Sequence, residues 1–341
     1  MYLASLATAV PEPSFSQPEC WEIVRQSGAL ERLSSRAGTL LEKVLLGNSG
    51  IDRRHFSTEA PGDLFTLDGG GLNRLFETAA PALAGKALEK ALAAAGLAAD
   101  RVDALFVCTC TGYLCPGVSS HVAEARGLRG DIFLQDIVGL GCGAAIPMLR
   151  SAHGFLAANP EARVACVAVE VCSAAFYLDN DPGVLISACL FGDGAAAAVL
   201  TGSESAGTYR IGNFTTAHRP ESRELLRFTN VGGKLRNRLH RSIPEVAARA
   251  VRDIHARSAL QGSRVVPHTG GRDVLDALEN TFPEEDFSPS REILRAFGNQ
   301  SSPSVLFSLE RVWSRPHPPD RLWLTSFGAG FAAHGCELVR F

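Results

Sequence analysis

Short runs of apolar and β-branched residues recur along the chain and alternate with longer stretches rich in alanine and leucine. Three of these runs predict buried strands, at 102–110 (VDALFVCTC), 164–170 (VACVAVE) and 195–201 (AAAAVLT). Because each run is apolar throughout instead of alternating, we expect helices to cover both faces of its sheet. The pattern therefore predicts an α/β architecture.

The spacing of apolar residues also predicts helices and a division of the chain. The interval 202–238 is rich in Gly, Ser, Thr and Arg and shows weak periodicity, so we place a boundary there, between a first half at 1–205 and a second half at 206–341. A helix at 82–96 ends at a glycine. In the second half the pattern predicts helices at 244–261, 272–280 and 304–313, and a final pair of strands around 321–340.

Composition and charge narrow the classes of protein. The 341 residues are 46% hydrophobic and 20% charged, with a formal net charge of −3, so no global positive field favours nucleic acid as a partner. The N-terminal 18 residues lack the pattern of a signal peptide, and no uncharged apolar run is long enough for a membrane span. The nine cysteines are spread out and odd in number, which favours reduced thiols and a cytoplasmic location.

Cys142 lies between two glycines in the segment Gly-Leu-Gly-Cys-Gly-Ala-Ala and precedes a stretch that can start a helix. The glycines permit a tight turn that points the side chain away from the backbone. A helix N-terminus favours the thiolate, which can hold an acyl group as a thioester. Cys142 is therefore a candidate acyl carrier, although a small buried cysteine that fills space fits this local pattern equally well.

Two later loops carry residues that suit the same chemistry. His268 lies in Val-Pro-His-Thr-Gly-Gly, where the glycines would let a substrate approach a residue that commonly transfers protons near neutral pH. Asn299 lies in Phe-Gly-Asn-Gln-Ser-Ser-Pro-Ser and can donate an N–H to a developing oxyanion. Ser302 in the same segment fits a helix cap. The order Cys, His, Asn predicts an acyl-transfer triad.

These three motifs resemble the triad of the type III polyketide synthases, the chalcone and stilbene synthase-like enzymes, which are related to ketoacyl-carrier-protein synthase III. The resemblance implies an α/β thiolase fold with two pseudo-symmetric α-β-α-β-α layered halves, and a homodimer. It covers nearly the whole chain, through similar segments at 50–56, 110–117, 169–177, 190–195 and 326–330.

The resemblance also implies a reaction. An acyl starter passes from coenzyme A to Cys142, malonyl-CoA is decarboxylated, and the resulting carbanion attacks the bound acyl group to extend a pyrone or aromatic polyketide. His268 would pair with the Cys142 thiolate and then, with Asn299, hold the thioester oxygen of malonyl-CoA, without a bound cofactor or metal. The substrate-binding residues that the resemblance implies are Phe191 as a gate, Cys110, Thr111, Cys115, Gly271, Gly328 and Ala329.

Coenzyme A recognition is where the sequence departs from the plant enzymes. Their basic residues ahead of the Gly-Ile-Asp-Arg-Arg motif fall here on Leu41, Val44 and Asn48. Either other residues contact the phosphates or an acyl-carrier protein delivers the acyl group. The candidates for phosphate contacts are Arg53, Arg54, Ser302 and the basic segment 234–241.

Two further departures leave alternatives open. Asn237 falls near the position of a second gating phenylalanine, and Ala329 replaces a proline, as in ketoacyl-carrier-protein synthase III. The motifs around His268 and Asn299 favour the polyketide synthase. The alternatives are a single condensation with an acyl-carrier protein and a catalytically silent thiolase-fold subunit that binds a partner.

The remaining cysteines include the pattern C-x-C-x₄-C at Cys108, Cys110 and Cys115. A metal site would need a fourth ligand and a suitable loop. Because Cys108 and Cys110 fall in a predicted strand, we interpret them as packing residues and predict no metal.

Overall fold

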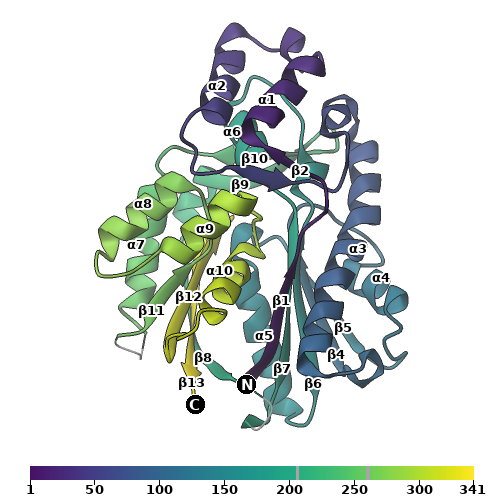
Figure 1. Ribbon diagram of the computed structural model, residues 1–341, viewed down its shortest axis with the longest axis vertical. Coiled ribbons are helices and arrows are strands. Elements are labelled where there is room, and N and C mark those ends of the chain that lie inside the picture. Colours follow the sequence, from purple (N-terminus) through teal and green to yellow (C-terminus); the bar gives the residue numbers. More distant parts are fainter. Residues whose placement is uncertain (205–206, 259–261) are drawn as a thin grey trace.

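The computed structural model describes residues 1–204, 207–258 and 262–341. A mixed sheet of nine strands runs through the molecule in the order β11-β12-β13-β8-β1-β7-β6-β4-β5 (Figure 1). Its strands are β1 (Tyr2–Ala9), β4 (Ala104–Thr109), β5 (Phe133–Val138), β6 (Arg163–Glu170), β7 (Gly194–Thr201), β8 (Tyr209–His218), β11 (Arg264–Pro267), β12 (Arg321–Gly328) and β13 (Ala332–Arg340).

Helices and two short strand pairs complete the fold. The helices are α1 (Gln17–Gln26), α2 (Ser35–Leu46), α3 (Gly69–Ala95), α4 (Val118–Ala125), α5 (Ala145–Ala158), α6 (Pro182–Leu190), α7 (Ile243–His255), α8 (Arg272–Thr281), α9 (Ser288–Phe297) and α10 (Ser304–Trp313). The strand pairs are β2 (Ser14–Ser16) with β3 (Arg53–His55), and β9 (Leu226–Val231) with β10 (Lys234–Leu239).

The elements form layers, and a hydrophobic cluster fills each space between them. Helices α3 and α4 cover the outer face of the strands β1, β4, β6 and β7. Helices α5 and α10 lie between these strands and the group β8, β11, β12 and β13, so their apolar residues are buried on both sides. Helices α7 and α8 cover the other face of that second group. This arrangement confirms the α/β prediction.

The predicted strands and most predicted helices are present. All residues of β4 and β7 are buried, in agreement with their uniformly apolar sequences. Helix α3 ends at Gly96 as predicted, but it begins at Gly69 instead of 82. Its start was missed because three glycines and an internal Pro81 interrupt the apolar pattern, whereas Asp68 caps the helix by accepting from the N–H of Gly71.

The second half contains more strand than its sequence indicated. The weakly periodic interval 202–238 holds β8, β9 and nearly all of β10. The helix predicted at 244–261 ends at His255, and residues 259–261 of that prediction lie outside the described residues. The proposed boundary between residues 205 and 206 also lies outside them, between β7 and β8. The division into two halves stays a prediction.

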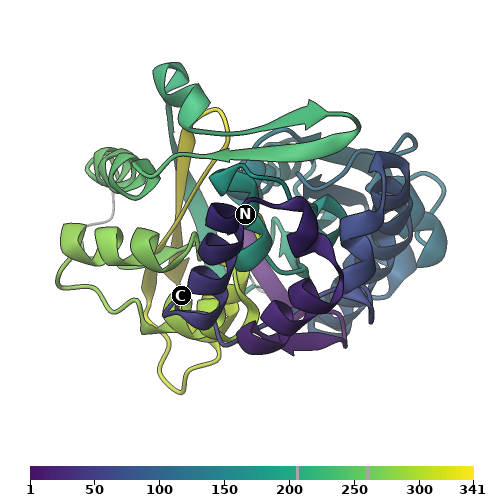
Figure 2. The ribbon, with the colours of Figure 1, turned by 90° about the horizontal axis from the view of Figure 1, so that it is seen from above.

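The hairpin β9–β10 reaches from the second half across the end of the molecule that carries α1, α2 and α6 (Figure 2). Asn237 on β10 hydrogen-bonds Ser187 on α6, and Arg236 forms an ion pair with Asp181 at the start of α6. The hairpin thereby closes one side of a pocket whose other walls come from the first half and from Ser301.

Candidate active site

Cys142 lies in a single 3₁₀ turn between the end of β5 and the start of α5. Gly141 has a positive φ of 58°, and a side chain there would come within 2.8 Å of the backbone nitrogen of Ala329. A side chain on Gly143 would come within 3.1 Å of the Gly328 nitrogen. The flanking glycines therefore let the nucleophile turn pack directly against the loop after β12, and they confirm the predicted tight turn.

The Cys142 thiol has one hydrogen-bond partner among the described residues. Ser301 Oγ lies 3.2 Å from Cys142 Sγ, and the same oxygen lies 3.3 Å from Cys110 Sγ. Ser301 adopts a positive φ of 61°, which is uncommon for a residue other than glycine and brings its side chain between the two thiols. Burial raises the pKa of the Cys142 thiol to about 12. The free site therefore holds a neutral thiol unless a base takes its proton.

His268 follows β11 and is almost fully buried, with 1% of its surface exposed. Its backbone N–H donates to the carbonyl of Thr325 at 3.0 Å, which extends the pairing of β11 with β12 by one residue. The ring meets Phe327 edge-on, with 4.4 Å between ring centroids. Burial lowers the pKa of the imidazole to about 3, so the ring is neutral and can accept a proton.

Asn299 follows α9 and Gly298, whose φ is 71°. Its backbone N–H donates to the carbonyl of Leu190 at 2.9 Å, and its Oδ1 accepts from the N–H of Ser301 at 2.8 Å. Because an N–H requires an acceptor, the amide oxygen is fixed towards Ser301. The Nδ2 group has no acceptor among the described residues, so it can donate to a bound oxyanion.

Hydrogen bonds join the loops that carry these residues. The N–H of Thr269, beside His268, donates to Ser304 Oγ at 3.4 Å, and that hydroxyl donates to the carbonyl of Ser301 at 2.7 Å. Ser301 in turn contacts Cys142. The structure thus brings the loops of Cys142, His268 and Asn299 together.

Glu170 at the end of β6 holds two loops by hydrogen bonds, the loop of Cys110 and Thr111 and the loop of Ser302. Its carboxylate is fully buried and accepts from the N–H of Cys110 at 2.9 Å, the N–H of Thr111 at 3.1 Å and the hydroxyl of Thr111 at 2.8 Å. It also accepts from Thr109 and from Ser302. Burial raises the pKa of this carboxyl, an effect that the hydrogen bonds oppose. The sequence could not distinguish this role from a solvated strand end.

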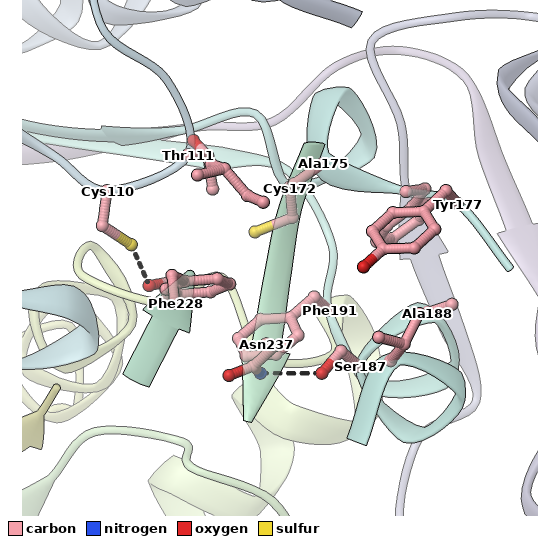
Figure 3. A pocket seen from close by; sticks show the side chains of 14 residues that line it. Cys110, Thr111, Cys172, Ala175, Tyr177, Ser187, Ala188, Phe191, Phe228 and Asn237 are labelled. Atoms are coloured by element: carbon pink, nitrogen blue, oxygen red, sulfur yellow. Dashed lines mark hydrogen bonds between the residues drawn. The ribbon is translucent and has the colours of Figure 1, made fainter. Parts of the chain in front are cut away.

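A pocket lies under the β9–β10 hairpin and is lined by Cys110 and by Ser301, whose hydroxyl contacts the Cys142 thiol (Figure 3). It encloses about 420 Å³ between atoms, its open mouth included. The predicted residues Phe191, Cys110 and Thr111 line it. Asn237, which the resemblance places near a second gating residue, also lines it. The lining residues that sequence reasoning did not assign to the pocket are Cys172, Ala175, Phe176, Tyr177, Val184, Ser187, Ala188, Phe228, Leu235 and Ser301.

Other predicted substrate-binding residues lie elsewhere around the site. Gly328 packs its backbone against Cys142 and Gly143, and Ala329 lies against Gly141. Gly271 precedes α8 with a φ of 126°. Cys115 is exposed and is not part of the pocket wall.

Two of the predicted coenzyme A contacts are wrong. Arg54 is 2% exposed, and its guanidinium donates to Gln17 and to the carbonyls of Ala188 and Phe191. Its charge is used inside the protein, where it holds the backbone next to the pocket. Ser302 is fully buried, and its hydroxyl donates to Glu170. Neither side chain reaches the surface, whereas Arg53 is exposed.

Within residues 1–204, 207–258 and 262–341, no group of His, Cys, Asp and Glu could hold a metal ion, and Cys108 is buried in β4. Over the same part of the chain, no helix is long and apolar enough to cross a membrane. All nine cysteines are free thiols.

The sequence matches known proteins over most of its length. Residues 13–269 match the model of the FAE1/type III polyketide synthase-like protein family. The chain is 31% identical to a 1,3,6,8-tetrahydroxynaphthalene synthase of Streptomyces peucetius, with 97% of this chain and 91% of that protein covered. It is also 31% identical to a 3,5-dihydroxyphenylacetyl-CoA synthase of Amycolatopsis orientalis, with 91% and 85% covered.

Solved structures match the fold as a whole. The crystal structure of 1,3,6,8-tetrahydroxynaphthalene synthase from Streptomyces coelicolor superposes with a TM-score of 0.87 at 26% identity and covers 100% of this chain and 99% of its own. The structure of PKS-I from the brown alga Ectocarpus siliculosus gives a TM-score of 0.90 at 24% identity, with 100% and 98% covered, which supports the fold alone. These likenesses confirm the thiolase fold.

Proposed function

Because the chain belongs to the type III polyketide synthase family, we propose that it condenses an acyl starter with malonyl units and that Cys142, His268 and Asn299 carry out this reaction. It is an acyltransferase that forms carbon–carbon bonds by decarboxylative Claisen condensation. The observation that carries the assignment of the residues is the convergence of their three loops, linked through Ser301 and Ser304, beside one pocket.

Acyl transfer begins with a proton transfer between two buried groups. Burial raises the pKa of Cys142 and lowers that of His268, so separate charges are costly, whereas a thiolate and an imidazolium formed together offset each other. His268 takes the thiol proton, and the thiolate attacks the carbonyl carbon of the starter thioester. Coenzyme A leaves as a thiolate that water protonates, and the N–H groups of Cys142 and Ala329 stabilise the tetrahedral oxyanion.

Decarboxylation of the malonyl unit follows at the same site. Its carbon–carbon bond to the carboxylate breaks, CO₂ departs, and the electron pair moves onto the thioester oxygen as an enolate. The protonated His268 and the Nδ2 of Asn299 donate to that oxygen, the latter because its own oxygen is held by Ser301. The enolate carbon then attacks the acyl group on Cys142, which leaves as thiolate and restores the pair.

We propose coenzyme A thioesters as the substrates. We also propose that the protein is located in the cytoplasm, where its nine thiols stay reduced. Relatives of this chain are named for the synthesis of 1,3,6,8-tetrahydroxynaphthalene and of 3,5-dihydroxyphenylacetyl-CoA, so products assembled from several malonyl units are the class that we infer here. Arg53 stays a candidate for phosphate contact because it is exposed.

We also propose a homodimer that forms across the edge of the sheet. Strand β5 pairs with β4 on one side and ends the strand order on the other. Phe133 and Val138, at the two ends of β5, are 45% and 50% exposed. An unpaired apolar edge is a template for a symmetric contact with a second copy. Light scattering should report a dimer for the wild type and a monomer for Val138→Lys, and a monomeric wild type would contradict this assembly.

The proposed activity is tested by incubating the protein with malonyl-CoA and a series of acyl-CoA starters. We expect release of coenzyme A and CO₂ and products that contain more than one malonyl unit. Cys142→Ala is the matched control, because it removes only the sulfur atom and keeps a small residue between the two glycines. Products from Cys142→Ala at the wild-type rate would contradict the assignment. Products with a single malonyl unit, formed from a malonyl-carrier protein alone, would contradict the multi-round reaction.

A further inference from the structure

One wall of the pocket carries a buried hydrogen-bond acceptor without a partner. Asn237 on β10 lines the pocket and is 4% exposed. Its Oδ1 atom has no hydrogen-bond partner among the described residues. Buried polar atoms nearly always have partners, so an unpartnered one in a pocket wall marks a place where a ligand supplies the missing group.

The orientation of this amide is fixed by a chain of hydrogen bonds from α6. Ser187 Oγ donates its only hydrogen to the carbonyl of Gly183 at 2.6 Å. At Asn237, 2.7 Å away, the same oxygen can therefore only accept. The amide must turn its Nδ2 towards Ser187, which leaves Oδ1 on the opposite side of the amide, without a partner among the described residues. Figure 3 shows the nitrogen on the bond to Ser187 and the oxygen turned away from it.

Most of the surrounding wall offers no partner for that oxygen. Phe228 lies opposite Asn237 in the β9–β10 register, and Leu235 and Phe191 add further apolar surface. Tyr177 is the exception. Its hydroxyl points into the pocket and has no hydrogen-bond partner among the described residues (Figure 3). Burial raises the pKa of Tyr177 to about 12, so this hydroxyl is neutral. The pocket is thus largely apolar, and among its polar groups Asn237 Oδ1 and the Tyr177 hydroxyl have no partner in the described residues.

We infer that the pocket binds an acyl chain with an O–H donor, which donates to Asn237 Oδ1. The donor is an alcohol or phenol of the starter, or the enol tautomer of a β-keto group in the growing chain. This inference rests on the proposed function, because it takes the pocket to hold the acyl chain of Cys142. An alkyl chain of the same length would leave Oδ1 buried without water or a partner, and sites built in this way discriminate against such analogues.

Pairs of acyl-CoA starters with equal chain length, one ending in a hydroxyl and one in a methyl group, test the inference. At the length where the hydroxyl reaches Asn237, the wild type should prefer the hydroxylated starter by about tenfold in kcat/KM. Asn237→Leu, which is close in size, should abolish or reverse that preference. Ser187→Ala should weaken it, because the amide is then free to turn. Leu235→Val is the matched control and should change both starters alike.

A second arm separates the two sources of the donor. With malonyl-CoA as starter and extender, Asn237→Leu should release shorter products than the wild type if the donor is an enol of the growing chain. It should leave these products unchanged if the donor belongs to the starter. The inference is overturned if Asn237→Leu and Ser187→Ala both keep the wild-type preference at every length and the wild-type products. A wild-type chain that accepts no acyl group contradicts the proposed function as well.

Discussion

The nucleophile centre and the pocket wall lie side by side, but different features of the chain build them. Cys142, His268 and Asn299 are held mainly by backbone contacts: a turn packed on Gly328, a strand extension at Thr325 and a loop tied to Leu190. The pocket wall combines side chains on α6, β9 and β10 with residues of the loops after β4 and β6, and these meet only because the hairpin folds across the first half. Local sequence motifs therefore position the residues proposed for the chemistry, whereas tertiary packing shapes the pocket proposed to select the substrate.

Loss of the nucleophile should have the largest effect. Cys142→Ala removes the atom that carries the acyl group, so product formation should fall by at least about 10³-fold. Measurement of coenzyme A release and of products checks this. The thermal stability of Cys142→Ala should stay near that of the wild type, because the thiol makes a single weak hydrogen bond. A pocket-wall variant that lost acyl transfer to the same extent would contradict this difference between the two regions.

His268 should control how the reactivity of Cys142 depends on pH. A thiol with a pKa of about 12 is ionised to about one part in 10⁵ at pH 7, so His268→Ala should slow alkylation of Cys142 by iodoacetamide at least ~10²-fold. Because only the free thiolate then reacts, the rate in the variant should rise about tenfold per pH unit from 7 to 10. The wild-type rate should be nearly flat, because His268 takes the proton within the site. Equal slopes for the two proteins would contradict this role.

Asn299 should affect decarboxylation more than acyl transfer. Asn299→Leu removes the Nδ2 donor from the enolate and should lower malonyl-CoA decarboxylation by about 10²–10³-fold. Acylation of Cys142 by the starter should change much less, because that step uses other donors. Separate assays of CO₂ release and of the acyl-enzyme give the two rates. A loss of equal size in both would indicate that Asn299 supports the loop instead of the enolate.

Glu170 should affect stability, and two substitutions there should differ in how much stability is lost. Glu170→Leu leaves several buried donors without an acceptor and should lower the free energy of unfolding by about 3 kcal/mol or more. Glu170→Gln keeps one acceptor oxygen for Cys110 and Thr111, and Ser302 can turn to accept from the new amide. It should therefore fold.

The pH dependence of unfolding gives a second test of Glu170. Burial raises its folded pKa above the unfolded value, so its contribution to stability is present at low pH and is lost as pH rises through the folded pKa. The stability of Glu170→Gln relative to the wild type should therefore increase with pH, as measured by chemical denaturation at several pH values. A difference that is constant or falls with pH would show that the hydrogen bonds outweigh the burial.

Phe228 should give the smallest change in rate and a clear change in product. Phe228→Ala removes a ring from the pocket wall, so the space available to the growing chain increases. Acylation of Cys142 should stay within about threefold of the wild type, while the mean number of malonyl units in the products rises. Product analysis by mass spectrometry checks this. Unchanged products would mean that this wall does not limit chain length.

The candidate centre could be proposed from the sequence because its signals are local. Gly141 and Gly143 mark the turn, and the loops of His268 and Asn299 carry glycines of their own. Strands such as β7 were visible because both of their faces are buried. The start of α3 was hidden by its glycines and Pro81, and β8 to β10 were hidden because their half-exposed residues lack a regular alternation.

Most of the pocket wall could not be predicted because no local pattern marks it. Asn237, Ser187 and Tyr177 acquire their roles from each other and from the hairpin above α6. Arg54 was assigned to phosphate binding because it lies in a basic motif. In the structure, tertiary contacts bury its guanidinium against backbone carbonyls, which the sequence does not reveal. Ser301, which contacts both Cys142 and Cys110, was seen only as part of the Asn299 motif.

The central claim is that Cys142 carries the acyl chain while His268 receives its proton. Peptide mapping by mass spectrometry, after brief incubation with a starter acyl-CoA without malonyl-CoA, tests it most directly. The account predicts an acyl adduct on the peptide with Cys142, about 10² times slower to form in His268→Ala. It predicts none on the peptides with Cys110 or Cys172, although both thiols line the same pocket. An adduct on either of those cysteines, with Cys142 unmodified, would contradict the account.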